Sequence, residues 1–205
     1  MKKSNNYIKK NFDISFLIAR RKVDFFYSKF NFIGNSEFFS IIIKLKNKKN
    51  NYLSKLKINS YKKKKISDNL KKFYTSSNKT KSGYFNREKK DWGIIDFKIK
   101  QNKFVINEFK KKKNSIGYIV YKKNCIYEYG YDINFFRLFI HAIKGVFKKE
   151  VEIKNPDNRM ISEFKKYDEV LINKRFCTYG GHMINIFKKK ELENIHYNIN
   201  YFDEF

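Results

Sequence analysis

The sequence predicts an α+β fold of two small lobes, preceded by a basic N-terminal extension. Apolar residues recur at helical spacing just after residue 66, whereas short β-branched and aromatic runs, which favour strands, dominate the rest. Aromatic residues make up 19% of the chain, which is too much apolar surface for a disordered polycation. We therefore expect an extension over residues 1–60, an N-terminal α/β lobe over 61–130, and a β-rich C-terminal lobe with one short helix over 131–205.

The net charge indicates the class of partner. Lys and Arg total 47 against 20 Asp and Glu, which gives a formal charge of +27 and an isoelectric point of about 9.9. Such a charge favours a polyanion, and nucleic acid is the commonest one. A membrane surface is the alternative, but a spanning helix needs about 18 continuous apolar residues. The most apolar stretch, residues 11–33, is interrupted by Arg20, Arg21, Lys22 and Lys29.

In the extension, residues 39–45 (FSIIIKL) read as a short strand or a buried helical turn. The charge run 60–65 (SYKKKK) marks the boundary with the first lobe. We expect residues 1–60 to follow the surface of the rest of the molecule without forming a domain of their own.

The first lobe reads as helix, strand, helix, strand, strand. Its first helix is capped by Ser67 or Asp68 and carries apolar residues at helical spacing. The first four of these elements are a helix over 66–74, a strand over 93–98, a helix over 103–113 and a strand over 117–121.

The second lobe is mostly β. Residues 133–143 (INFFRLFIHAI) are β-branched and aromatic and therefore read as a strand, and residues 146–153 supply the next one after a turn at Lys144-Gly145. Residues 184–187, together with Ile195 and Ile199, complete an apolar C-terminal layer.

Two loops in this lobe are candidates for binding. Pro156 cannot donate to a sheet ladder, and Arg159 follows it three residues on. The pair Gly180-Gly181 lets the backbone approach a partner closely. Two tight loops on a basic chain can hold an RNA backbone, although two ordinary hairpin turns in a β domain would give the same pattern.

Catalytic and metal sites are not signalled. Asp91, Asp96 and the pair Asp168-Glu169 lack the spacing of a metal site, so we expect no catalytic residue and no metal. No GxxxxGK[ST] or GxGxxG motif is present, so no nucleotide cofactor is expected. The two cysteines, Cys125 and Cys177, lack CxxC spacing, which favours a reducing compartment over a disulfide framework.

Four blocks of residues occur in the order found in one ribosomal family. They are ISDNLKKFYTS from residue 66, Gly117-Tyr118-Ile119, Ile153–Arg159 with its Pro and Arg, and Cys177–Met183 with its Thr, second Gly and Met. Over about 140 of 205 residues, the chain thus resembles the S-eight family of small-subunit ribosomal proteins. It departs from that family at Cys177 and Tyr179, which replace serines, and at Gly180, which replaces a lysine. Residues 125–132 look inserted, and residues 1–60 have no counterpart in compact bacterial members.

The resemblance implies a non-enzymatic structural protein of the small ribosomal subunit. It would bind the central domain of small-subunit rRNA, support assembly and translation, and contact neighbouring ribosomal proteins, through residues 1–60. The AT-rich codon usage that the composition suggests favours a mitochondrion, with a plastid or a bacterial cytoplasm as alternatives. A small basic nuclease is the alternative function. The implied RNA-binding residues are Lys71, Lys72, Thr75, Lys154, Asn155, Pro156, Arg159, Lys174, Arg175, Cys177, Thr178, Tyr179, Gly180 and Gly181.

Overall fold

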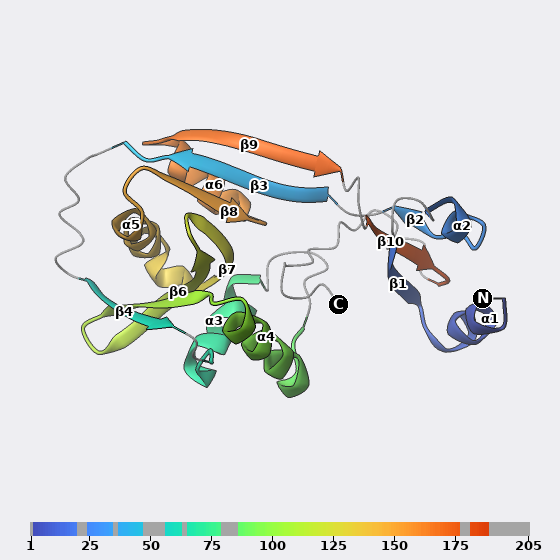
Figure 1. Ribbon diagram of the computed structural model, residues 1–205. Coiled ribbons are helices and arrows are strands. Elements are labelled where there is room, and N and C mark those ends of the chain that lie inside the picture. Colours follow the sequence, from blue (N-terminus) through green and yellow to red (C-terminus); the bar gives the residue numbers. More distant parts are fainter. Residues whose placement is uncertain are drawn as a thin grey trace. The chain divides into compact units, whose positions relative to one another are not determined.

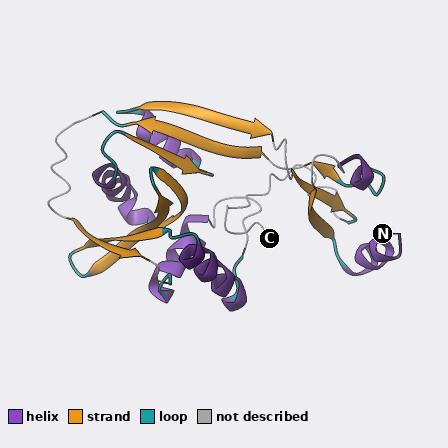
Figure 2. Cartoon of the chain, viewed as in Figure 1, coloured by secondary structure: helices purple, strands orange, loops and turns teal. Residues whose placement is uncertain are grey.

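The fold is α+β, as the sequence predicts, and the chain divides into two compact units (Figures 1 and 2). The structure is a computed structural model that describes residues 2–19, 24–34, 37–46, 56–62, 65–78, 86–176 and 181–188. Unit 1 comprises residues 1–38 and 174–197, and unit 2 comprises residues 39–173 and 198–205. The boundaries expected at residues 60 and 130 therefore lie inside unit 2, within its strands β4 and β7.

Unit 1 is built from segments near both ends of the chain. Its antiparallel sheet has the order β1-β10-β2, and β10 is the central strand. Phe32 and Met183 form its buried core, against which Leu17, Tyr27 and Phe30 pack. The elements are α1 (Lys2–Asn11), β1 (Ile14–Ala19), α2 (Asp24–Ser28), β2 (Ile33–Gly34) and β10 (Gly181–Ile186).

Unit 2 contains a seven-stranded sheet of order β4-β5-β6-β7-β8-β3-β9. Its strands are β3 (Glu37–Lys44), β4 (Leu56–Lys62), β5 (Val105–Lys111), β6 (Asn114–Lys122), β7 (Cys125–Tyr131), β8 (Glu150–Lys154) and β9 (Glu169–Phe176). The expected strands over 39–45 and 117–121 are thus confirmed as β3 and β6. Residues 125–132 look like an insertion when the sequence is compared with the ribosomal family, but in the structure they supply β7, near the middle of the sheet.

Helices cover both faces of this sheet (Figure 1). Successive side chains of a strand point to opposite faces, and Tyr118 packs with α3 and α4 whereas its neighbour Ile119 packs with α5 and α6. The helical elements are α3 (Asp68–Asn78), α4 (Lys89–Gln101), the 3-10 turn η3 (Ile133–Phe135), α5 (Phe136–Val146) and α6 (Asn158–Lys165). The first of these confirms the helix predicted over 66–74, with Ser67 O accepting from Leu70 N at its start.

The prediction of a strand over 93–98 is wrong, because this segment lies inside helix α4. The apolar residues Trp92, Ile95 and Ile99, three and four positions apart, make one buried face. A capping box between Glu88 and Asp91 fixes the start of the helix. Helical spacing and capping therefore override the alternation seen in the short window.

Two further predictions exchange helix and strand. Residues 103–113 form strand β5 rather than a helix, because their apolar residues pack on both sides of the sheet, with Ile106 in one core and Phe109 in the other. Residues 133–143 form η3 and α5 rather than a strand. The buried residues Phe139, Ile140 and Ile143 recur at helical spacing, and the β propensity of single residues yields to that period.

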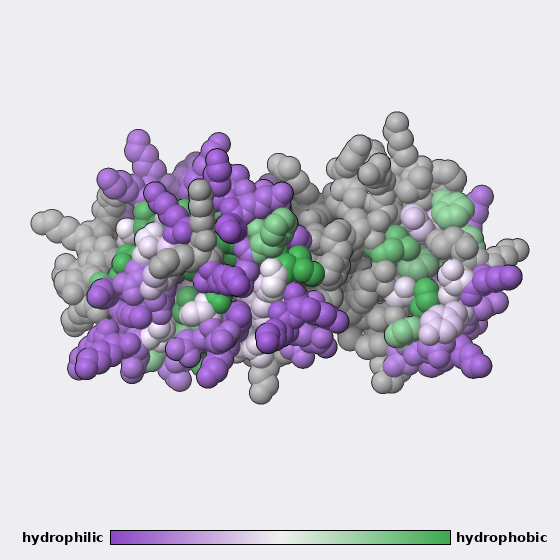
Figure 3. Space-filling view, turned by 60° about the horizontal axis from the view of Figure 1, so that its bottom comes forward, coloured by the Kyte–Doolittle hydropathy of each residue, from purple (hydrophilic) through white to green (hydrophobic). Residues whose placement is uncertain are grey.

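No helix in the described part of the chain has both the length and the apolar character needed to cross a membrane. Hydrophilic side chains predominate on the face of unit 2 drawn in Figure 3, with smaller apolar areas between them.

Candidate functional site

The geometry of the site starts from strands β7 and β8. They are the parallel pair among the strand pairings that the structure describes, and helix α5 connects them. Their pairing is short, with Cys125 opposite Glu152 and Ile126 opposite Ile153. β7 then continues to Tyr131, whereas β8 ends at Lys154. The carboxyl ends of the two strands are therefore not hydrogen-bonded to each other, and such an end of a parallel sheet is where ligands commonly bind.

Helix α5 begins at the same end of β7. The side chain of Asp132 caps η3 by accepting a hydrogen bond from Asn134 N at 2.9 Å. Phe135, which precedes α5, makes no side-chain cap. The backbone N–H groups that lead into α5 are already engaged, because Phe135 N donates to Asp132 O and Phe136 N donates to Ile133 O. The start of a helix nevertheless carries partial positive charge, so the start of α5 can attract an anion.

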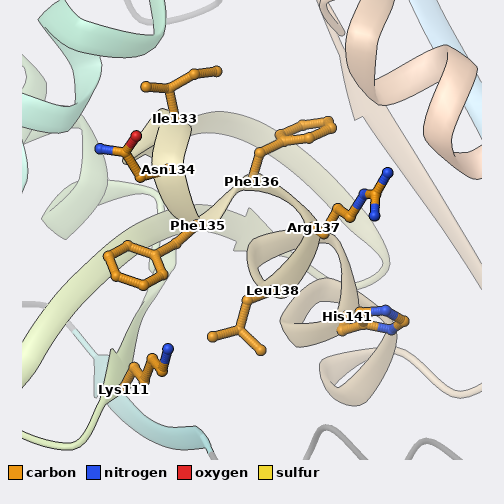
Figure 4. Close-up of a pocket in the computed structure, with 8 residues that line it drawn as sticks. All are labelled: Lys111, Ile133, Asn134, Phe135, Phe136, Arg137, Leu138 and His141. Carbon is orange, nitrogen blue, oxygen red and sulfur yellow. The ribbon is translucent and has the colours of Figure 1, made fainter.

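A pocket of about 570 Å³ lies around this helix start. Its lining residues are Lys111, Ile133, Asn134, Phe135, Phe136, Arg137, Leu138 and His141. Figure 4 shows Lys111, Phe135 and Leu138 on one side of the helix start and Phe136, Arg137 and His141 on the other. The Lys111 ammonium lies 5.0 Å from the centre of the Phe135 ring. Since Lys111 and Arg137 are both exposed and no acidic residue lines the pocket, it favours an anionic ligand with an apolar part.

His141 contributes no charge to this pocket near neutral pH. Burial and, to a lesser degree, the positive charge of Lys144 lower the pKa of its imidazole. The cationic character of the pocket therefore comes from Lys111 and Arg137.

Two tyrosines of β7 span the opening between the carboxyl ends of β7 and β8. Tyr129 Oη donates to Asn155 O at 2.9 Å and accepts from Asp157 N at 2.9 Å. Tyr131 Oη donates to Asp157 Oδ2 at 2.6 Å. Burial is the main cause that raises the pKa of both phenols, and the negative charge of Asp157 raises them further, so both remain protonated donors.

The other face of β7 holds a buried ion pair that belongs to the core. Arg87 Nη2 lies 2.6 Å from Glu128 Oε2, and Tyr118 donates to Glu128 Oε1 at 2.9 Å. The Arg87 guanidinium also lies 3.8 Å from the centre of the Tyr74 ring. Both oxygens of Glu128 are thus engaged, so this carboxylate is not free to act as a base. Among the described residues, no group of His, Cys, Asp and Glu side chains could hold a metal ion.

The residues expected from the sequence to bind RNA lie in separate elements. On α3, Lys72 and Thr75 are exposed, and Lys71 Nζ pairs with Asp68 Oδ1 at 2.8 Å. Residues 154–159 form the β8–α6 turn and the start of α6, which packs on the opposite face of the sheet from α3. Pro156 is buried, Asn155 has a φ of 46°, and Arg159 is exposed.

The second expected loop is described only at its edges. Lys174 and Arg175 lie in β9, and Gly181 begins β10. Cys177, Thr178, Tyr179 and Gly180 lie outside the described residues.

No family model matches the sequence, and no curated protein matches it. The fold, in contrast, matches solved structures. A GCN5-related N-acetyltransferase from Anabaena variabilis has a TM-score of 0.58 and 14% identity, over 91% of this chain and 49% of that chain. A GCN5-related N-acetyltransferase from Kribbella flavida has a TM-score of 0.60 and 9% identity, over 91% and 46% of the two chains. A conserved protein from Enterococcus faecalis V583, described as a probable N-acyltransferase, has a TM-score of 0.57 and 15% identity, over 91% and 48%.

The chain has the fold of these acetyltransferases. It spans about half the length of the structures that it matches. The solved structures that share this fold are acetyltransferases and not ribosomal proteins. The resemblance to the S-eight ribosomal family, which rests on four short blocks of residues, is therefore wrong. The same likeness contradicts the expected role in the small ribosomal subunit and in translation. It also contradicts the expected binding to rRNA and to ribosomal proteins, and the expectation that the chain is not an enzyme. The alternative of a nuclease finds no support either.

Sequence reasoning missed the residues that form the pocket. Residues 103–113 are predicted as a helix and residues 133–143 as a strand. With these assignments, no helix is expected to start near Lys111 and Arg137, so the sequence does not indicate a binding site there. The signal that could have found the site is the helical spacing of Phe136, Phe139 and Ile140 directly after the capping residue Asp132.

Proposed function

We propose that unit 2 is an acyltransferase domain that binds an acyl-coenzyme A donor at the start of α5 and transfers its acyl group to an amine. The observation that carries this proposal is the cationic pocket at the start of α5, beside the carboxyl ends of β7 and β8, which are not hydrogen-bonded to each other. The likeness to N-acetyltransferases supports the reaction class.

The pocket suits the phosphate-bearing part of such a donor. Arg137 and Lys111 would hold phosphate oxygens, and the partial positive charge at the start of α5 would add to the attraction. The exposed faces of Phe135 and Phe136 can pack against a purine. Asp132 opposes this binding by its charge, but its side chain is held by Asn134 N and does not line the pocket.

The strand ends suit the rest of the donor. Acyl-coenzyme A has an extended arm with two amide groups, and amides can pair with N–H and C=O groups on a strand edge that faces no neighbouring strand, as β7 does beyond its pairing with β8. When bound, the donor would supply a thioester, whose carbonyl carbon an acceptor amine attacks while the carbon–sulfur bond breaks and the thiol leaves. The domain would orient the thioester and exclude water from it.

Calorimetric titration with acetyl-coenzyme A at physiological ionic strength tests the proposal. The variant Lys111→Ala/Arg137→Ala should bind about 5- to 30-fold more weakly than the unaltered chain, because two partly exposed charge contacts are lost. The matched control is Lys148→Ala/Lys149→Ala, which removes the same charge from two exposed residues beyond the other end of α5.

The control should bind acetyl-coenzyme A as the unaltered chain does. Equal losses in the two double variants would mean that only the overall charge attracts the ligand, and the absence of any binding at millimolar concentration would refute the proposed function outright. Transfer itself is measured as release of the coenzyme A thiol in the presence of primary amines.

A further inference from the structure

We propose that Tyr129, Tyr131 and Asp157 form a latch that determines which part of the donor the site admits. In the structure, the latch closes the opening between β7 and β8, so the phosphate-bearing end can bind at α5 while the acyl arm is kept out. This inference rests on the proposed function, and it concerns residues of β7 and of the β8–α6 turn rather than the pocket itself.

The latch residues join the two sides of the opening directly. Tyr129 and Tyr131 come from the part of β7 that lies beyond its pairing with β8, and Asp157 comes from the turn that follows β8. Three hydrogen bonds of 2.6–2.9 Å cross from one side to the other. On the edge that faces β8, the end of β7 is therefore tied to the turn by side chains, where a neighbouring strand would otherwise supply backbone bonds.

The turn side of the latch is held firmly in place. Asp157 Oδ1 accepts from Met160 N at 2.8 Å and so caps α6, while Oδ2 accepts from Tyr131. Asn155 adopts a left-handed backbone with φ of 46°, which costs energy for a residue with a side chain and so persists only where surrounding contacts enforce it. The bond from Tyr129 to Asn155 O is one such contact.

The tyrosine side is equally constrained. Tyr129 and Tyr131 are only 5% and 2% exposed, and their rings stack with centres 6.3 Å apart. Tyr131 also stacks on Phe139 of α5 at 5.1 Å. The rings are thus part of the core, and only the two hydroxyl groups take part in closing the opening.

An arm that ran along the end of β7 would meet these bridging hydroxyls first. It could pair with the strand only after the bonds to Asn155 and Asp157 had broken, which would leave buried polar groups without their partners. We infer that the closed chain binds acetyl-coenzyme A no more tightly than its phosphate-bearing fragment, and that transfer requires the latch to open.

The test compares two probes, acetyl-coenzyme A and adenosine 3′,5′-bisphosphate, which keeps the nucleoside with its 3′-phosphate and first 5′-phosphate but has no arm. In the unaltered chain their dissociation constants should agree within about threefold. In Tyr129→Phe/Tyr131→Phe, which keeps both rings and removes both hydroxyls, acetyl-coenzyme A should bind about tenfold more tightly because hydrogen bonds no longer oppose the arm. The bisphosphate should bind as before. Tyr121→Phe on the neighbouring strand β6 is the control and should change neither value.

A second variant tests the latch even if the double tyrosine variant fails to fold. Asp157→Ser retains a good helix-capping residue but is too short to reach Tyr131, so it should raise acetyl-coenzyme A affinity in the same direction. The latch is refuted if the unaltered chain already binds acetyl-coenzyme A at least tenfold more tightly than the bisphosphate, or if neither variant raises the affinity for acetyl-coenzyme A relative to the bisphosphate. If neither probe binds to any of these chains, the proposed function fails, and the latch fails with it.

Discussion

Arg87 and Glu128 have the least exposed side chains among the ion pairs in the described part of the chain, at 0% and 1%. Burying two charges is costly, and their attraction offsets the cost only when the remaining polar atoms are also satisfied. Tyr118 donates a hydrogen bond to Glu128, and the rings of Tyr74 and Trp92 lie against the Arg87 guanidinium. The pair therefore fixes how α3, α4 and β7 meet, rather than taking part in chemistry.

The variant Glu128→Gln should lower the free energy of unfolding by about 3–5 kcal/mol, because it leaves the Arg87 charge buried and uncompensated. Urea denaturation followed by circular dichroism measures this change. The control is Glu169→Gln, which breaks a 2.8 Å pair with Lys44 whose side chains are 52% and 51% exposed. The control should lose less than about 1 kcal/mol, and an equal loss in both variants would contradict a structural role for the buried pair.

Cys125 illustrates how burial controls reactivity. Burial, helped by the negative charge of Glu152, raises the pKa of its thiol to about 11. At pH 8, only about a thousandth of the thiol is then ionised, and the thiolate is the reactive form. In a Cys177→Ser background, alkylation by iodoacetamide at pH 8 should be at least a hundredfold slower in the folded chain than in urea. A difference smaller than tenfold would show that Cys125 is accessible and ionised.

At the scale of single residues, the sequence located basic and aromatic side chains but not their partners. Lys71 was expected to contact phosphate, yet it pairs with Asp68 and lies 5.7 Å from the Trp92 ring. The partner of a surface lysine depends on the helix register and on neighbouring elements, which composition does not encode. Arg137 became a candidate only once its segment was seen to start a helix.

At the scale of elements, the errors have one physical cause. Short apolar windows in α4, β5 and α5 fit both the helical and the strand period, and tertiary burial decided between them. Elements with an additional local signal were predicted correctly, as α3 was from the candidate capping residues Ser67 or Asp68 at its start. Asp132 is such a signal for the start of η3 and α5. The β-branched and aromatic residues that follow it nevertheless led to the prediction of a strand.

Substitution of a glycine tests how closely strand β7 and helix α3 pack against each other. A Cβ at Gly130 of β7 would lie 2.7 Å from Tyr74 N and 2.8 Å from Phe73 C, which are backbone atoms of α3 and cannot rotate away. The change Gly130→Ala should therefore destabilise the chain by about 1–3 kcal/mol. Gly93→Ala in α4, where a Cβ meets nothing within 4 Å, should stabilise it by about 0.5–1 kcal/mol. Thermal unfolding compares the two, and the same sign for both would contradict the packing of α3 on β7.

At the scale of the whole molecule, the two units are formed in different ways. Unit 2 has a single large sheet made within residues 37–176, whereas the sheet of unit 1 needs β10 to join β1 and β2 from near the other end of the chain. Pairing between the ends of the chain has no local sequence signal, so residues 1–60 read as an extension without a domain. The α+β class itself could be predicted, because it depends only on the kinds of element present.

A proline in β10 tests this organisation. Ile184 pairs with Phe16 of β1 and Ile33 of β2, and Ile184→Pro removes a backbone donor from the central strand. Hydrogen exchange should show lost protection in β1 and β2 and retained protection in β5 and β6. Ile184→Val, which keeps the donor, should leave both sheets protected. Loss of protection in β5 and β6 as well would contradict two separate cooperative units.

The central claim is that the start of α5 binds the phosphate-bearing end of an acyl-coenzyme A. The most direct measurement is a titration of the isotopically labelled chain with acetyl-coenzyme A, followed by backbone amide chemical shifts. The account predicts that the largest shifts fall on residues 134–138 and on Lys111, and that the amides of β4 and α4 stay unmoved. Shifts spread evenly over the lysine-rich surface, or absent from residues 134–138, would contradict it.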